Sequence, residues 1–281
     1  MANRKLDMGT AWTQATGLMS ANRDTISAIA GLFFFLPALA SALLLPGLSN
    51  PPQPGPNADP EVAMRAMLDQ ISAIYAANWP LLLALVVVQF IGSMSLFALL
   101  TDRGNPTVGE ALRTGVRSLP SYLAAQIVTV LGASLAIGIP TGVLSAMGGM
   151  AVGVLALLVA LVLILYVMVK LSLVAPVIAI EGQLNPLAAL ARSWQLTKGN
   201  SLRIVLFVVL LVVVFGIIAV LVGGILGLVL SAMGETVALI GGSVIDALVN
   251  SLLAVVFLVV TVAIYRQLAG PTPEREAELF E

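Results

Sequence analysis

Three polar residues interrupt apolar stretches in which a charge is costly. Lys170 lies in VMVKLSL, and Asp246 and Asn250 lie in GGSVIDALVNSLL. Both charges fall near the middle of runs long enough to cross a bilayer, where ionisable residues are rare and are functional candidates. We therefore treat Lys170, Asp246 and Asn250 as a candidate intramembrane polar site. A Lys170–Asp246 ion pair would serve a substrate or ion, or would only join two helices; alternatively, Lys170 extends its ammonium to the interface.

The residue types needed for most catalytic chemistry are missing from the sequence. It contains no Cys, which excludes thiolate nucleophiles and disulfides, and no His, the commonest general base and transition-metal ligand. We also find no phosphate-binding loop, nucleophile–base pair or cluster of metal ligands. The sequence therefore predicts no catalytic residue, no metal and no cofactor, and a protein that is not an enzyme.

The composition predicts an all-α integral membrane protein. Of the 281 residues, 59% are hydrophobic and only 10% are charged, against about 25% charged in soluble domains. Mean hydropathy is +1.06, and a net charge of −1 gives no reason to expect a nucleic-acid partner. Apolar runs of this length satisfy their backbone only as helices. Six spans are expected, at 25–47, 80–100, 120–140, 150–180, 203–231 and 237–265. Pro37, Pro120, Pro140 and Pro176 are expected to kink spans or to mark their ends.

The basic residues predict the orientation of the spans. Eleven Lys and Arg residues lie before the first span, after the sixth, or between spans two and three or four and five. The other three connections hold only Arg65, and Lys170 lies inside a span. Because Lys and Arg are concentrated in cytoplasmic segments, both termini are expected in the cytoplasm.

Two short polar segments between spans resemble each other. Residues 104–123 read GNPTVGEALRTGVRSLPSYL and residues 184–202 read LNPLAALARSWQLTKGNSL. Each begins with Asn-Pro, which suits an N-cap followed by the first helical turn. In the second segment an apolar stripe ends at Trp194, and Gly199 can terminate the helix. Both segments are predicted to be amphipathic helices in the cytoplasmic interface.

The N-terminal segment looks like a third copy, because Ala11 to Asn22 has the spacing of Ala189 to Asn200. In addition, LSAMG occurs in two outer connections, at 144–148 and 230–234. We therefore predict one membrane domain over 1–281, built of three pseudo-repeats that each combine an interfacial helix with a transmembrane hairpin. The repeats are placed at 7–100, 105–180 and 185–267, followed by a cytoplasmic tail at 268–281.

The first repeat contains an outer insertion at 48–79. Its Pro-rich part, 48–60, is expected to be extended, and 60–79 is expected to form an amphipathic helix that ends near Tyr75 and Trp79. This helix either lies in the outer interface or docks a partner protein.

The predicted interfacial helices carry basic and aromatic residues that suit phospholipid headgroups. The same basic residues are also explained by orientation alone. The candidates for headgroup contact are Trp12, Arg113, Arg117, Arg192, Trp194 and Lys198.

Several motifs resemble one bacterial inner-membrane family. AxLARSWQLTKGN after EGQLNP, and YRQLAG at the end of the last span, are similar to the membrane domain of glycerophosphoryl diester phosphodiesterases; YciC-type membrane proteins are similar too. The resemblance extends over nearly the whole chain and implies a six-span module of the bacterial inner membrane. In the full enzymes, hydrolysis belongs to a separate soluble domain with His and acidic metal ligands. Since this sequence has no His, the resemblance does not imply phosphodiesterase activity.

The sequence therefore favours a non-enzymatic membrane protein that handles lipid, or that supports or regulates membrane partners. Membrane phospholipids are its expected partners, together with a possible membrane protein. The alternative is a small transporter or channel with Lys170, Asp246 and Asn250 at its centre. A lipid role predicts a lateral apolar groove, whereas a transporter predicts a polar cavity that opens to water.

The predicted orientation can be tested by cysteine labelling, because the native chain has no Cys. We expect Met147→Cys and Met233→Cys, in the two LSAMG turns, to react with a membrane-impermeant maleimide applied to intact cells. Gln195→Cys should react only after permeabilisation. The reverse pattern would place the basic segments outside and overturn the orientation.

Overall fold

The computed structural model describes residues 5–49, 59–100 and 107–270. The chain is all-helical over these ranges, with 91% helix and no strand in the described part. Six helices are long and apolar enough to cross a membrane, at 23–44, 62–99, 108–147, 149–181, 201–231 and 235–269. This confirms the predicted all-α membrane class and its six spans.

The chain divides into two compact units. Unit 1 contains 1–22, 94–212 and 257–281, and unit 2 contains 23–93 and 213–256. The division does not follow the predicted repeats, because all three predicted interfacial segments belong to unit 1. The repeats as such therefore stay a prediction.

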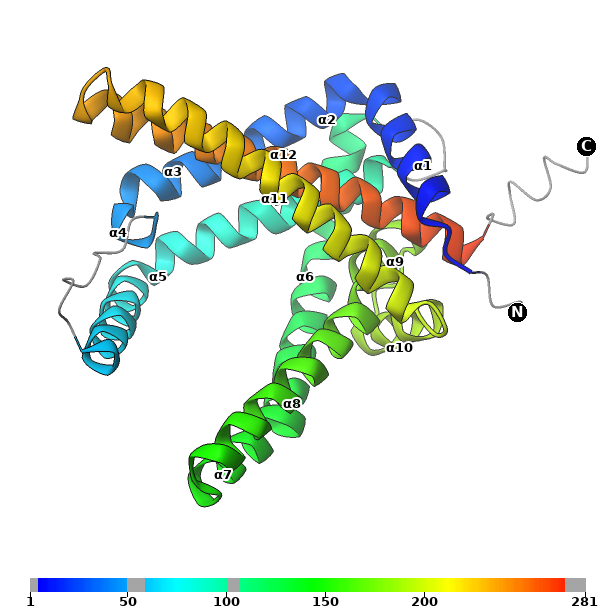
Figure 1. Ribbon diagram of the computed structural model, residues 1–281. Coiled ribbons are helices and arrows are strands. Elements are labelled where there is room, and N and C mark those ends of the chain that lie inside the picture. Colours follow the sequence, from blue (N-terminus) through cyan, green and yellow to red (C-terminus); the bar gives the residue numbers. More distant parts are fainter. Residues whose placement is uncertain (1–4, 50–58, 101–106, 271–281) are drawn as a thin grey trace, which may run out of the picture. The chain divides into compact units, whose positions relative to one another are not determined.

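Unit 1 is built around a long helical hairpin and the short helices at the end opposite its turn (Figure 1). One arm consists of α6 (Val108–Ala133), the π-helix η2 (Ser134–Gly138) and α7 (Ile139–Met147). The other arm is α8 (Gly149–Leu171), which packs against α7. The unit also contains α1 (Met8–Ala21), α9 (Val174–Glu181) and α10 (Pro186–Leu196), with parts of α5, α11 (Ser201–Ser231) and α12 (Glu235–Ala269).

Unit 2 contains the first span and parts of three long helices. The first span runs through α2 (Arg23–Ala30), the π-helix η1 (Gly31–Phe35) and α3 (Leu36–Leu44), and the short α4 (Pro46–Ser49) follows. Helix α5 (Pro60–Leu99) contributes its first part, which includes the predicted outer helix. It is kinked at Asn78, where the backbone leaves helical geometry two residues before Pro80. A helix is therefore present where the amphipathic helix was predicted, but it continues through the kink into span two.

The three segments predicted to be interfacial helices start in the same way. Their N-caps are Asp7, Thr107 and Asn185, whose side chains accept hydrogen bonds from backbone N–H groups of the first turn. Four and eight residues after each cap lies a small buried residue; these pairs are Ala11 and Ala15, Ala111 and Gly115, and Ala189 and Ser193. Because small side chains let helices approach closely, each segment packs by this face.

The second segment differs from the prediction in two respects. It is no separate helix, because α6 runs without a break from Val108 through Pro120 to Ala133. Its cap is Thr107, which forms a capping box with Glu110, while the expected Asn105-Pro106 start lies outside the described residues. In the third segment the prediction is confirmed, since Asn185 caps α10 with Pro186 in its first turn.

Two of the predicted proline kinks coincide with π-helical turns. The turn at 31–35 is followed by Pro37, and the turn at 134–138 by Pro140, with the same spacing in both spans. A proline cannot donate the regular i to i−4 hydrogen bond, and a widened turn is one way to relieve the resulting crowding. Both prolines thus mark a local widening of the span.

The two LSAMG segments each link two spans, as predicted, between α7 and α8 and between α11 and α12, but the turns differ by one residue. After the first, the residue with positive φ is Gly149 (φ 71°), whereas in the second it is Gly234 (φ 109°), the last residue of the motif. Side chains with a Cβ rarely adopt this conformation, so a glycine is needed at both turns.

The cap of α1 gives a pH-dependent prediction. Hydrogen bonding from Thr10, whose backbone N lies 2.6 Å from Asp7 Oδ1, holds the pKa of the Asp7 carboxyl below its usual value. The cap therefore contributes fully above the unfolded pKa of about 3.9 and is lost as the pH falls through the lower folded pKa. In a Trp79→Phe, Trp194→Phe background, we expect Trp12 fluorescence to report an acid transition of α1. Asp7→Asn keeps an acceptor that does not titrate, so a transition that persists in this variant would contradict the assignment.

Candidate functional site

The fourth span is interrupted between α8 and α9. Helix α8 ends at Leu171, Ser172 and Leu173 form a turn, and α9 begins at Val174. Pro176 is the physical reason, because it has no N–H to donate to Ser172 and its ring crowds the preceding turn. The kink or span end predicted at Pro176 is therefore found as a break inside an apolar stretch.

Helix α10 satisfies the backbone groups that this break exposes. The Ser193 hydroxyl donates to the Lys170 carbonyl (Oγ to O, 2.8 Å) and accepts from the Leu173 N–H (3.2 Å). The Thr197 hydroxyl lies 3.3 Å from the same carbonyl, one turn further along the chain. Both side chains are fully buried. Because an unpaired buried backbone group costs about 1–3 kcal/mol, Ser193 fixes α10 against the end of α8.

Lys170 is buried between two aromatic rings at this junction. Its Nζ lies 5.5 Å from the ring centroids of Tyr166 and Trp194, within cation–π range, and only 4% of the residue is exposed. The two rings meet edge to face, with centroids 5.7 Å apart. Within the described part of unit 1, no carboxylate lies within 4.0 Å of the ammonium. Lys198 follows the end of α10 and is exposed.

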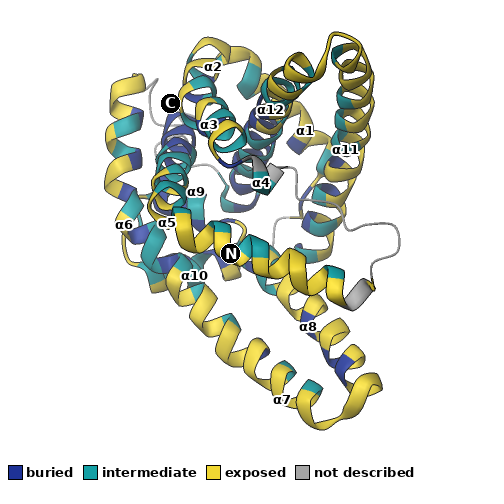
Figure 2. Ribbon diagram, turned by 90° about the vertical axis from the view of Figure 1, so that its left-hand side faces the viewer, coloured by how far each residue is buried: buried dark blue, intermediate teal, exposed yellow. Residues whose placement is uncertain are grey.

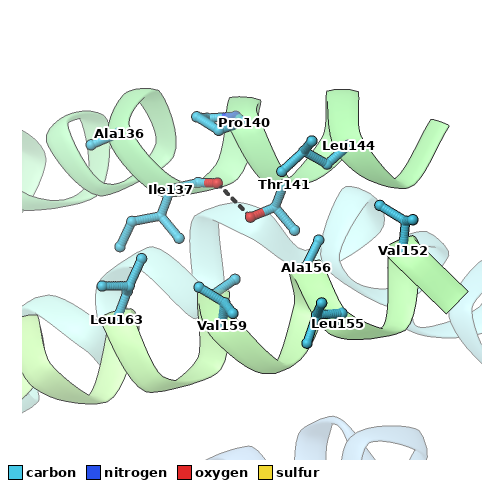
Figure 3. Close-up of a pocket in the computed structure, with 11 residues that line it drawn as sticks. Ala136, Ile137, Pro140, Thr141, Leu144, Val152, Leu155, Ala156, Val159 and Leu163 are labelled. Atoms are coloured by element: carbon cyan, nitrogen blue, oxygen red, sulfur yellow. Dashed lines mark hydrogen bonds between the residues drawn. The ribbon is translucent and has the colours of Figure 1, made fainter. Parts of the chain in front are cut away.

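An apolar groove leads away from this aromatic pair along α8. Its inner compartment, of about 580 Å³, lies between α6, η2, α8 and α10 and is lined by Tyr166, Leu190 and Trp194 at one end. Its outer compartment, of about 240 Å³, lies between η2, α7 and α8 (Figure 3). Ala136, Ile137 and Leu163 line both compartments, so the two adjoin each other along the hairpin. Much of the α7–α8 hairpin is exposed (Figure 2), as expected for a surface that faces lipid.

A second polar cluster joins α9, α10 and α12. The Arg192 guanidinium contacts both Glu181 oxygens through Nε (3.1 and 3.3 Å), and the Tyr265 hydroxyl donates to Glu181 Oε1 (3.0 Å). Arg266 donates to the Leu100 carbonyl (2.7 Å) at the end of α5. Tyr265 and Arg266 belong to the YRQLAG motif, whose structural role is thus to bind helix ends together.

The backbone segment before α1 is held by residues that follow α10 and by the YRQLAG motif. Leu6 donates to Asn200 Oδ1 (2.9 Å), and its carbonyl accepts from Arg203 (3.0 Å). The Gln267 amide exchanges two hydrogen bonds of 3.1 Å with the backbone of Asp7. These contacts link the first and last helices of unit 1.

The predicted headgroup residues have different surroundings. Arg113 and Arg117 are exposed one turn apart on α6, and Lys198 is exposed after α10. Trp12 is 38% and Trp194 41% exposed. Arg192 is already engaged by Glu181. None of these observations tests contact with a lipid, which stays a prediction.

The predicted polar site is divided between the two units. Lys170 belongs to unit 1, and Asp246 and Asn250 belong to unit 2. The Asn250 amide donates to the Asp246 backbone carbonyl (2.8 Å) within α12, and both residues are exposed. The Lys170–Asp246 pair therefore remains a prediction.

Ser193 and Thr197 were missed by sequence reasoning, which followed the apolar stripe of α10 towards Trp194. The spacing of small residues could have indicated this buried face, because Ala189, Ser193 and Thr197 recur at every fourth position. In the described ranges no group of three metal-ligating side chains is found. The donors at the site are hydroxyl, ammonium and aromatic groups, which are poor ligands for a metal.

The fold and the site together define a polytopic α-helical membrane protein with a lateral apolar groove. A family model described as the membrane domain of glycerophosphoryl diester phosphodiesterase matches residues 136–276, half of the chain. The chain therefore belongs to this family, which confirms the resemblance over residues 136–276. The matched region includes Lys170, α10 and the YRQLAG motif. Searches of curated proteins and of solved structures found no match.

The role of Ser193 can be tested by unfolding the protein in mixed micelles with increasing dodecyl sulfate. Ser193→Ala leaves the Lys170 carbonyl and the Leu173 N–H without their shared partner, so we expect a loss of about 1–3 kcal/mol in the free energy of unfolding. Ser172→Ala is the matched control, because this exposed hydroxyl only donates to a carbonyl of its own helix. Equal losses in both variants would refute the role of Ser193 as the bridge.

Proposed function

We propose that this protein is a non-enzymatic, lipid-handling module of the bacterial inner membrane. Its ligand is an amphiphile with an anionic headgroup and a long acyl chain. The chain lies in the groove along α8, and the headgroup lies beside Lys170 and Lys198. Membrane phospholipids are the expected source.

The observation that carries this proposal is the combination of charge and groove. The buried Lys170 ammonium lies beside Tyr166 and Trp194, which line one end of the apolar groove, and no unit 1 carboxylate of the described ranges pairs with it. An anion at this position would neutralise the charge of the ammonium. The inner compartment alone falls within the range of about 300–1,000 Å³ that is common for small-molecule sites.

The length of α8 supports a headgroup at Lys170. Its span, Gly149–Leu171, is 23 residues long. At about 1.5 Å per residue this is about 35 Å, enough to cross a hydrocarbon core of about 30 Å without α9. Lys170 is then in the last turn of the span, near the interface. This differs from the mid-membrane position expected when the span was taken to continue to residue 180.

The three similar helix starts support the proposed pseudo-repeats. Each has an N-cap followed by small buried residues at the fourth and eighth positions. With the basic residues in the cytoplasm, these starts lie at the inner interface. Trp12, Arg113 and Arg117 then join Trp194 and Lys198 at the level of the headgroups.

The proposal is tested by native mass spectrometry after extraction in a mild detergent that retains lipids. We expect the wild type to carry anionic lipid and Lys170→Leu to carry less, by about fivefold or more, since one cation near the surface is worth about 1 kcal/mol. The substitution itself should be tolerated, because replacing a buried charge by an apolar residue is often neutral or stabilising.

Lys5→Leu is the matched control, because Lys5 is exposed and does not line the groove. It should leave the bound lipid unchanged, and Lys170→Arg should restore it in part. Absence of bound lipid from the folded wild type would overturn the proposal, as would an equal loss in the Lys5 control.

A further inference from the structure

We propose that the groove limits the length of the acyl chain it holds, and that Ala156 and Ala160 at its outer end set this limit. The inference rests on the proposed function, because it concerns the same groove. It adds that the protein selects its lipid by the length of the acyl chain.

The two compartments of the groove meet at three shared residues. Ala136, Ile137 and Leu163 are shared by both, and Ile137 is 8% exposed. Because η2 is a π-helix, this arm is widened where the compartments meet. A chain that enters beside Tyr166 must pass this point to reach the outer compartment.

The outer compartment suits the end of a hydrocarbon chain. Its lining is apolar except for Thr141, whose hydroxyl donates to the Ile137 carbonyl (2.7 Å; Figure 3). The Thr141 hydroxyl is therefore satisfied as a donor by a carbonyl of its own arm. A terminal methyl group would meet no polar group that needs a partner.

The distance along α8 also matches one leaflet. An acyl chain that fills half of a hydrocarbon core of about 30 Å is about 15 Å long. At about 1.5 Å per residue, this length reaches from Tyr166 to the level of Ala156. The end of such a chain therefore falls in the outer compartment, beside Ala156 and Ala160.

The two arms of the hairpin pack closely against each other near this level. A Cβ placed on Gly153 would lie 3.6 Å from the Ser145 Cα, so α7 and α8 are in contact there. Ala156 and Ala160 are 9% and 7% exposed and present only a methyl group to the groove. A larger side chain at either position would occupy the space of the last methylenes.

The test measures chain-length preference directly. Purified protein is offered a graded series of saturated lysophosphatidic acids, and separately a matching series of fatty acids, and bound species are identified by native mass spectrometry. Burying one methylene is worth about 0.8 kcal/mol, or about fourfold in affinity. We expect Ala160→Phe to lower the ratio of longest to shortest bound chain by at least about tenfold. The series that binds identifies the headgroup.

The controls separate this inference from the proposed function. Val162→Phe adds an aromatic ring to an exposed position that does not line the groove, and should leave the preference unchanged. Leu163→Ala widens the groove where the compartments meet and should shift the preference towards longer chains, which keeps the test decisive if Ala160→Phe fails to fold. Bound lipid with the same preference in Ala160→Phe and Leu163→Ala would overturn the inference alone. A wild type without bound lipid would overturn the proposed function.

Discussion

Backbone groups in an apolar surrounding have no water to bind, and this constraint shapes the inner end of unit 1. Pro176 interrupts the fourth span and leaves the Lys170 carbonyl and the Leu173 N–H without their helical partners. One hydroxyl, that of Ser193, satisfies both. The polar helix α10 between two apolar spans is therefore explained by the backbone hydrogen bonds that it supplies to the neighbouring broken span. Its buried face is made of small and hydroxyl residues, and its apolar stripe faces outwards.

The position of α10 in turn creates the candidate site. With Ser193 fixed against the break, Trp194 meets the edge of Tyr166 and both rings lie beside the Lys170 ammonium. The same helix closes the inner end of the groove with Leu190 and Trp194. Charge, aromatic rings and groove are thus arranged by one short element. Each depends on the hydrogen bonds that hold this element in place.

The sequence predicted the features that follow from composition and local pattern. The helical class, the six spans and the Asn185 cap are confirmed, because hydropathy and capping act over a few neighbouring residues. The continuity of α6 was missed, since a polar start and a proline at 120 do not by themselves end a helix. Ser193 and the groove were missed for a different reason. Both depend on residues that are far apart in the chain, and no local pattern reports which helix supplies a partner to a broken span.

The contacts of the N-terminal residues have a consequence for synthesis. Gln267 leaves the ribosome 260 residues after its partner Asp7. Asn200 and Arg203 likewise emerge long after Leu6, their hydrogen-bond partner. The segment before α1 therefore lacks these partners until α12 has been synthesised. Unit 1 can reach its final packing only after this helix has been inserted, so its assembly is a late step.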